Sequence, residues 1–224
     1  MTQFAFCRRM NAVNRIRNVL IALLWLTALA CDGVAAATQA ILVFGDSLSA
    51  PYGIAEKRGW VSLLIERLEK ERLDYRVVNA SISGETTSGG RGRLAKVLAD
   101  HKPAVVILEL GGNDGLRGLP PEELRKNLTA IVRAARERHV AVVLCGMEAP
   151  PNAGPAYATA FREAFSRVAR DEHVPFVRFV LDKVAGIEGL NQQDGIHPNA
   201  RGARLVADTV WPALQPLLDP VSRS

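Results

Sequence analysis

The sequence predicts an α/β fold, in which helices cover both faces of a central, mostly parallel sheet of five strands. Short apolar runs rich in Val, Ile and Phe alternate with longer segments whose apolar residues recur at helical spacing. This alternation favours a parallel sheet with helices on both faces. The chain contains no internal repeat, low-complexity tract or break in composition that would divide it.

Each element can be assigned from its own pattern. The five strands are expected at residues 41–44, 76–78, 104–110, 141–145 and 176–179. Four helices are expected at residues 60–73, 91–98, 122–138 and 157–169. A last helix is expected at residues 203–218, interrupted or kinked near Pro212, because proline cannot donate the backbone hydrogen bond that a helix needs.

Residues 1–37 have the pattern of a secretory signal peptide. Arginines precede an apolar core at residues 19–30, and small residues follow at 34–37, which is the order of charge, hydrophobe and cleavage site. The core is shorter than a membrane span requires. An uncleaved anchor and a lipid-modified Cys31 are the alternatives. We therefore expect a periplasmic or secreted protein with a single domain at residues 38–224.

The charge and cysteine content of the predicted mature chain exclude several classes of function. Residues 1–37 hold four Arg and one Asp, so their removal lowers the formal net charge from +5 to +2. The remaining basic residues are scattered among acids, which argues against nucleic-acid binding. Removal of residues 1–37 would leave Cys145 as the single cysteine, so we expect no disulfide within the chain. Cys145 lies inside an apolar run, so we expect it to be a buried strand residue. We find no phosphate-cradling glycine loop and no cluster with metal-ligand spacing, and expect neither cofactor nor metal.

Ser47, Asp194 and His197 are the residue types of a serine hydrolase. Ser47 follows the first predicted strand, and Asp194 precedes His197 by three residues near the other end of the chain. A hydroxyl is a poor nucleophile unless a base takes its proton and a carboxylate fixes the tautomer of that base. Ligands of open α/β sheets bind outside the carboxyl ends of the strands, so these segments can converge at one edge. A helix-capping serine, a surface histidine and a turn aspartate are the alternatives.

Two further blocks lie between these residues, Ser83-Gly84-Glu85 and Gly111-Gly112-Asn113-Asp114. With Ser47, Gly84, Asn113 and His197 in this order, the chain resembles the SGNH (GDSL) hydrolases, a family named for a Ser, a Gly, an Asn and a His in separate blocks. The resemblance covers nearly the whole chain after residue 38. It is strongest to the branch of bacterial periplasmic acyl thioesterases, arylesterases and lysophospholipases. It implies the fold of that family, a flavodoxin-like three-layer α/β/α sandwich.

The resemblance also implies an oxyanion hole made by the N–H of Ser47, the N–H of Gly84 and the side-chain amide of Asn113. Glycine lets the backbone approach a substrate closely, and an amide donates a hydrogen bond without a competing charge. A turn glycine and a loop asparagine are the alternatives. Asp46 and Asp114 adjoin these residues, and we assign both to the local loops without a catalytic role.

The expected reaction is acyl transfer through an acyl-enzyme. The resemblance implies broad tolerance for aryl esters, short to medium acyl esters and acyl thioesters, with lysophospholipids as further candidates. A carbohydrate O-acetyl esterase would use the same residues with a more polar pocket, and a non-catalytic periplasmic binding module is the alternative outside enzymes. We expect a monomer whose partner is a small-molecule ester or thioester, with no stable membrane span once the signal peptide is removed.

The walls of the site are expected in the loops after the third and fourth strands. Glycines flank Leu116 and Arg117 in the loop at 115–120, which suits this loop to act as a lid beside the oxyanion hole. The candidates for an apolar groove that holds an acyl chain, with core packing as the alternative for each, are Leu116, Leu119, Met147 and Ile187.

Overall fold

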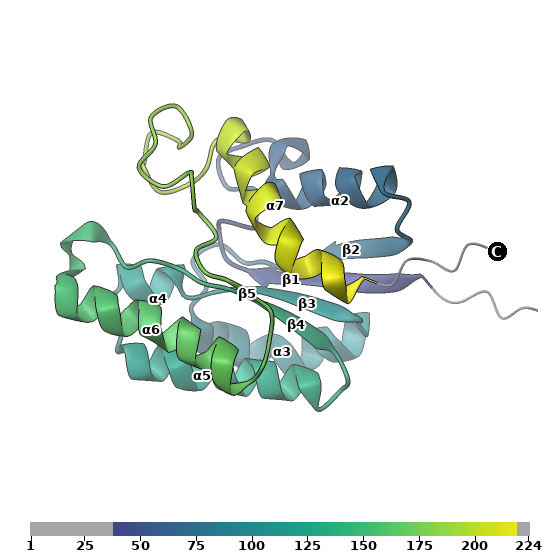
Figure 1. The fold of residues 1–224 in the computed structure, drawn as a ribbon, viewed down its shortest axis with the longest axis horizontal. Coiled ribbons are helices and arrows are strands. Elements are labelled where there is room, and N and C mark those ends of the chain that lie inside the picture. Colours follow the sequence, from purple (N-terminus) through teal and green to yellow (C-terminus); the bar gives the residue numbers. More distant parts are fainter. Residues whose placement is uncertain (1–37, 219–224) are drawn as a thin grey trace, which may run out of the picture. The chain divides into compact units, whose positions relative to one another are not determined.

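The computed structural model describes residues 38–218, which form a parallel sheet between two layers of helices (Figure 1). The strand order is β2-β1-β3-β4-β5, and each neighbouring pair is parallel. The strands are β1 Gln39–Gly45, β2 Tyr75–Asn79, β3 Val105–Glu109, β4 Ala141–Cys145 and β5 Phe176–Val177. The predicted α/β fold with five parallel strands is therefore confirmed. The predicted signal peptide at residues 1–37 lies outside the described residues.

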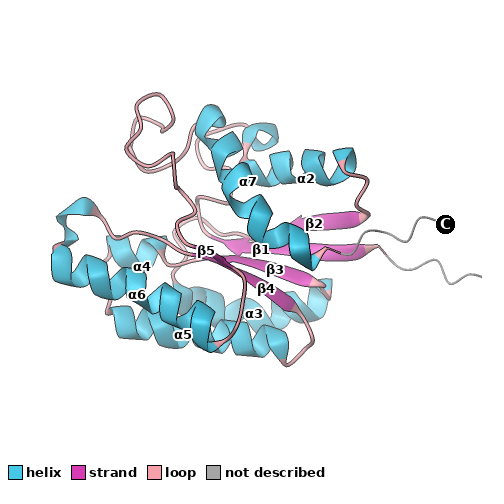
Figure 2. Cartoon of the chain, viewed as in Figure 1, coloured by secondary structure: helices cyan, strands magenta, loops and turns pink. Residues whose placement is uncertain are grey.

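The helices form one layer on each face of the sheet (Figure 2). The first layer consists of α2 Trp60–Lys70 and α7 Ala200–Leu214, which pack against each other. The second layer consists of α3 Thr87–His101, α4 Gly112–Leu116, α5 Pro121–Arg136 and α6 Pro155–Asp171, in which α5 packs against both α3 and α6. Short 3-10 helices lie at η1 Glu56–Arg58, η2 Pro151–Ala153 and η3 Gln215–Leu217.

The central strands are buried on both sides, which explains why they are continuous apolar runs rather than alternating ones. Residues 41–44 of β1 and 106–108 of β3 have no exposed surface. Each large apolar side chain buried in this way contributes about 1.5–3 kcal/mol relative to exposure. The register of the β1–β3 pair places Gly45 beside Glu109. The last residues of the two strands therefore meet at the sheet edge where ligands of such folds bind.

α3 begins at Thr87, four residues before its predicted start. Thr86 caps it, because its hydroxyl accepts a hydrogen bond from the N–H of Gly89 at 3.3 Å. The glycines in the first turns of this helix concealed the helical pattern, since glycine is a weak helix former. Gly90 is required by space, because a Cβ atom there would collide with Cδ1 of Leu110.

Other elements also differ from the prediction. α4 lies in a glycine-rich segment where a loop was expected, and β5 ends at Val177, two residues early. α7 contains Pro212 and ends at Leu214, so the expected interruption falls in its last turn. Among residues 38–218, we find no helix long and apolar enough to cross a membrane.

Candidate active site

The structure brings Ser47, His197 and Asp194 together in one hydrogen-bonded path. Nε2 of His197 lies 2.8 Å from Oγ of Ser47, although the two residues are 150 positions apart in the chain. Nδ1 of His197 lies 2.7 Å from Oδ2 of Asp194. A carboxylate can only accept, so Nδ1 carries the proton and Nε2 is left as the acceptor for the serine hydroxyl. This is the tautomer that a general base beside Ser47 needs.

The three-residue spacing between Asp194 and His197 works through a tight turn. Oδ1 of Asp194 accepts hydrogen bonds from the backbone N–H groups of Ile196 at 2.9 Å and His197 at 3.0 Å, while Gly195 has a φ of +68°. Burial acts to raise the pKa of Asp194. The hydrogen bonds from the backbone of His197 and Ile196 and from the His197 ring outweigh it, so this pKa lies below its ordinary value. Asp194 is therefore a carboxylate at neutral pH, oriented by its own turn.

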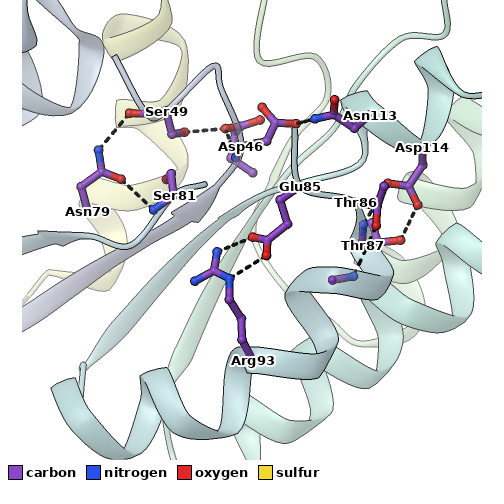
Figure 3. Close-up of polar contacts among 12 residues, drawn as sticks. Asp46, Ser49, Asn79, Ser81, Glu85, Thr86, Thr87, Arg93, Asn113 and Asp114 are labelled. Carbon is purple, nitrogen blue, oxygen red and sulfur yellow. Dashed lines mark hydrogen bonds and ion pairs between the residues drawn. The ribbon is translucent and has the colours of Figure 1, made fainter. Parts of the chain in front are cut away.

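The turn that carries Ser47 is fastened to two neighbouring segments. The backbone oxygen of Ser49 accepts a hydrogen bond from Nδ2 of Asn79 at 2.9 Å (Figure 3). The backbone oxygen of Leu48 accepts one from Nε1 of Trp60 at 3.1 Å. Asn79 ends β2 and Trp60 begins α2, so the position of Ser47 is fixed from both the sheet and the helix layer.

The two remaining residues of the predicted oxyanion hole lie on segments that join this turn. Asn113 lies in α4, and its Nδ2 donates a hydrogen bond to Oδ2 of Asp46 at 2.9 Å. Gly84 follows β2 with a φ of +81°, in the region that favours glycine. Its carbonyl accepts a hydrogen bond from Nη2 of Arg117 at 3.0 Å, which links the end of α4 to the segment after β2.

Asp46 has a contact that sequence reasoning did not find. As expected, it serves its own loop, because Oδ1 accepts the N–H of Leu48 at 3.0 Å. However, its other carboxylate oxygen holds the Asn113 amide, and the residue is only 1 % exposed. Burial raises the pKa of Asp46 to about 6, although the hydrogen bonds from Leu48 and Asn113 act to lower it.

Glu109 is a second buried acid, at the end of β3 beside Gly45, the residue before Asp46. Its Oε2 accepts hydrogen bonds from Oγ of Ser49 at 2.5 Å and from the N–H of Asp46 at 3.3 Å, while Oε1 is buried without a partner in the described part of the chain. Burial and the nearby Asp46 carboxylate raise the pKa of Glu109 well above its ordinary value. This shift favours the neutral form of Glu109. A glutamate at the end of an otherwise apolar strand was the signal in the sequence.

The Asp114 side chain supports α4 rather than facing the proposed nucleophile. Its carboxylate accepts hydrogen bonds from the N–H of Thr87 at 2.9 Å and from the Thr87 hydroxyl at 2.5 Å. The segment after Gly84 is held by an ion pair between Glu85 and Arg93, whose guanidinium lies 4.0 Å from the centre of the Phe44 ring. Both contacts are drawn in part in Figure 3, and both fix the elements that carry the predicted oxyanion donors.

The candidate lid and groove residues have different environments. Leu116 is 54 % exposed and ends α4, so the predicted loop at 115–120 begins as helix. Arg117 is exposed and Leu119 is partly buried. Met147 is 3 % exposed and packs in the core. Of its two predicted roles, core packing therefore fits and lining an acyl groove does not. Ile187 is 50 % exposed.

Cys145 is fully buried in β4, which agrees with the predicted structural role. Burial raises the pKa of its thiol well above the ordinary value, which disfavours the reactive thiolate. Within residues 38–218, we find no group of three or more His, Cys, Asp or Glu side chains that could hold a metal ion.

Comparison with known proteins identifies the family. Residues 43–205 match the model of the GDSL-like Lipase/Acylhydrolase family. The chain belongs to this family. The resemblance to the SGNH (GDSL) hydrolases is thereby confirmed, and the protein is a hydrolase rather than a non-catalytic binding module.

Two relatives and one solved structure show how far the similarity extends. Esterase TesA of Pseudomonas aeruginosa is 49 % identical over 183 residues, which cover 82 % of this chain and 91 % of the relative. Thioesterase 1/protease 1/lysophospholipase L1 of Escherichia coli is 37 % identical over 185 residues, which cover 83 % of this chain and 88 % of the relative. A crystal structure of TesA aligns with a TM-score of 0.79 at 49 % identity, covering 80 % of this chain and 100 % of that one.

Proposed function

We propose that the protein hydrolyses carboxylic esters and acyl thioesters through an acyl-enzyme on Ser47. The observation that carries this proposal is the path from Asp194 through His197 to Ser47, with hydrogen-bond distances of 2.7 and 2.8 Å. The names of the relatives support it, since one is called an esterase and the other a thioesterase and lysophospholipase.

The proposed reaction has two halves. Oγ of Ser47 attacks the carbonyl carbon while its proton passes to Nε2 of His197, and Asp194 stabilises the resulting imidazolium. The bond from the acyl carbon to the leaving oxygen or sulfur then breaks, and Nε2 gives its proton to the leaving group. Water next attacks the acyl carbon and gives a proton to Nε2. The bond to Oγ breaks, and the proton returns to Ser47.

The oxyanion of each half would be held by the N–H groups of Ser47 and Gly84 and by the side-chain amide of Asn113. The contact between Asn113 and Asp46 supports this role, because an amide nitrogen carries two hydrogens. One is donated to Asp46, and the other is left for the substrate oxygen. Donors fixed before the reaction need no reorganisation when the charge develops, which is why such a site accelerates acyl transfer.

The exposed apolar side chains in the segments after the strands and before α7 support an apolar substrate over an acetylated sugar. Among residues 38–218, six large apolar side chains are exposed, and five of them lie in segments that follow the carboxyl ends of strands or precede α7. These five are Tyr52, Ile82, Leu116, Ile187 and Ile196. The sixth, Ile65, lies on α2. A site that binds carbohydrate would instead present polar groups at these loops.

The substrate class can be tested with one series of compounds. We expect turnover of p-nitrophenyl esters to rise from acetyl to medium acyl chains and acetylated xylan to be a poor substrate. Ser47→Ala should lose activity on every ester. Release of acetate from xylan as the best reaction would support the O-acetyl esterase instead, and turnover by clean Ser47→Ala protein would contradict the assignment of the nucleophile.

The proposal includes export as a monomeric domain of residues 38–224. The order of arginines, apolar core and small residues in the first 37 positions supports it. N-terminal sequencing of protein recovered from the periplasm should give a start near Ala37 or Thr38, and a lipid-modified Cys31 would contradict it.

A further inference from the structure

Tyr52 lies directly against the ring of His197. The two ring centres are 4.5 Å apart at an angle of 37°, which is within the range of aromatic contacts. Even so, Tyr52 is 53 % exposed. Its hydroxyl has no hydrogen-bond partner among the described residues, so the ring itself makes the contact. An exposed aromatic surface therefore stands next to the proposed general base.

The position of Tyr52 is fixed through the loop that carries His197. Nε2 of Gln192 donates a hydrogen bond to the backbone oxygen of Tyr52 at 2.8 Å and to that of Pro198 at 3.1 Å. The N–H of Gln192 donates to the backbone oxygen of His197 at 2.8 Å. One glutamine thus ties the loop after β1 to the loop before α7. Tyr52 also lines a narrow hollow beside Ser47 and His197, whose apolar walls include Leu48, Ile54 and Trp60.

The chemistry of the proposed reaction places the leaving group on this side. His197 must return its proton to the leaving oxygen or sulfur, so that atom has to come within hydrogen-bond reach of Nε2. The donors proposed for the oxyanion belong to other residues, the N–H of Ser47, the N–H of Gly84 after β2 and the Asn113 amide in α4. The alcohol or thiol part of the substrate therefore leaves past His197, where Tyr52 is the neighbouring aromatic side chain.

We propose that Tyr52 is a specificity-determining residue, an aromatic surface beside His197 that selects substrates with an aromatic leaving group. The proposal rests on the proposed function, and it names the substrate class more closely. In the acylation step, the Ser47 Oγ–acyl bond forms, the bond from the acyl carbon to the leaving oxygen breaks, and that oxygen receives the proton from Nε2. An aromatic alcohol can pack against Tyr52 throughout this step. Aromatic pairs give roughly a 3- to 10-fold gain over contact with an aliphatic group.

The test compares benzyl butyrate with cyclohexylmethyl butyrate. The two esters share the acyl group and have leaving alcohols of similar size and acidity, so they form the same acyl-enzyme and differ in the aromaticity of the leaving group. kcat/KM reports the acylation step. We expect wild type to prefer the benzyl ester by roughly 3- to 10-fold, Tyr52→Phe to keep this preference, and Tyr52→Leu to lose it. Ile65→Leu, at an exposed apolar position on α2 outside the proposed substrate surface, is the matched control and should keep it.

Each other outcome is decisive. An unchanged ratio in Tyr52→Leu overturns the proposal. An equal fall in kcat/KM for both esters also overturns it, because the ring would then only orient His197. Failure of the proposed function is distinguishable, since wild type would then hydrolyse neither ester and Ser47 would not react with a fluorophosphonate. Tyr52 is more than half exposed, so Tyr52→Leu should fold, which far-UV circular dichroism would check.

Discussion

Asp46→Asn tests whether the buried aspartate holds the proposed oxyanion donor. The two carboxylate oxygens of Asp46 accept one donor each, the N–H of Leu48 at 3.0 Å and the Asn113 amide at 2.9 Å. Asparagine has the same size but offers one acceptor and one NH2 group. Two donors then compete for one oxygen, so either the turn of Ser47 or the amide of Asn113 loses its partner.

The size of the effect follows from the kind of bond that is lost. A hydrogen bond to a charged group contributes about 1.5–3 kcal/mol. Complete loss of an oxyanion donor lowers kcat by about 10²- to 10³-fold, and we expect this loss for Asn113→Ala. The same value is the upper limit for the effect of Asp46→Asn. Because Asp46→Asn misorients the Asn113 amide but leaves it present, we expect a fall in kcat of roughly 10- to 100-fold, with KM changed far less.

The assay is a double-mutant cycle on p-nitrophenyl butyrate. If Asp46 acts through Asn113, adding Asp46→Asn to Asn113→Ala should lower kcat by less than about 3-fold, because the shared interaction is already gone. If the fall in kcat of the double variant equals the product of the two single falls, the reasoning is refuted. Asp46 would then act through the turn of Ser47. Glu172→Gln is the control for lost stability: this buried carboxylate pairs with Arg133 and Arg136 before β5, so its loss should weaken the fold and spare kcat.

Three further predictions concern stability. Gly45→Ala should lower the free energy of unfolding by about 3 kcal/mol in urea titrations, because a Cβ would lie 2.8 Å from Oγ of Ser49 and 2.9 Å from the backbone oxygen of Glu109; Gly92→Ala, with open space, should not lower it. Cys145→Ala should cost about 1 kcal/mol and keep turnover, and a folded but inactive variant would refute the structural role. The pKa of Asp46 is raised from 3.8 to about 6 in the folded chain, so its stabilising contribution is complete below pH 4 and is lost as the pH rises through 6. The free energy of unfolding of wild type minus that of Asp46→Asn should fall from pH 4 to 7, and a constant difference would contradict the shift.

The strands were predictable because burial on both faces demands continuous apolar runs. β1 and β4 match their predicted runs closely. Elements rich in glycine were harder, since their helical state depends on tertiary packing rather than on propensity. α4 shows this: its Gly-Gly-Asn-Asp-Gly sequence is a poor helix former, yet the hydrogen bonds of Asp114 to Thr87 and of Asn113 to Asp46 hold it in place.

The hydrogen-bonded path from Asp194 through His197 to Ser47 was predictable from the sequence, but the contacts that hold its surroundings in place were not. The short spacing from Asp194 to His197 closes a local turn, which the sequence displays directly. The bond from Asp46 to Asn113 joins residues 67 positions apart and depends on the register of β1 beside β3. The contact of Tyr52 with His197 likewise depends on how two loops meet. Neither can be read from a pattern along the chain.

The central claim is that Ser47 is the nucleophile and that His197 activates it. Protein treated with a fluorophosphonate and digested should carry one adduct per chain, on the peptide that contains Ser47. His197→Ala should react far more slowly, and Ser47→Ala should not react. An adduct on another residue, or rapid hydrolysis of p-nitrophenyl butyrate by protein that forms no adduct on Ser47, would contradict the account.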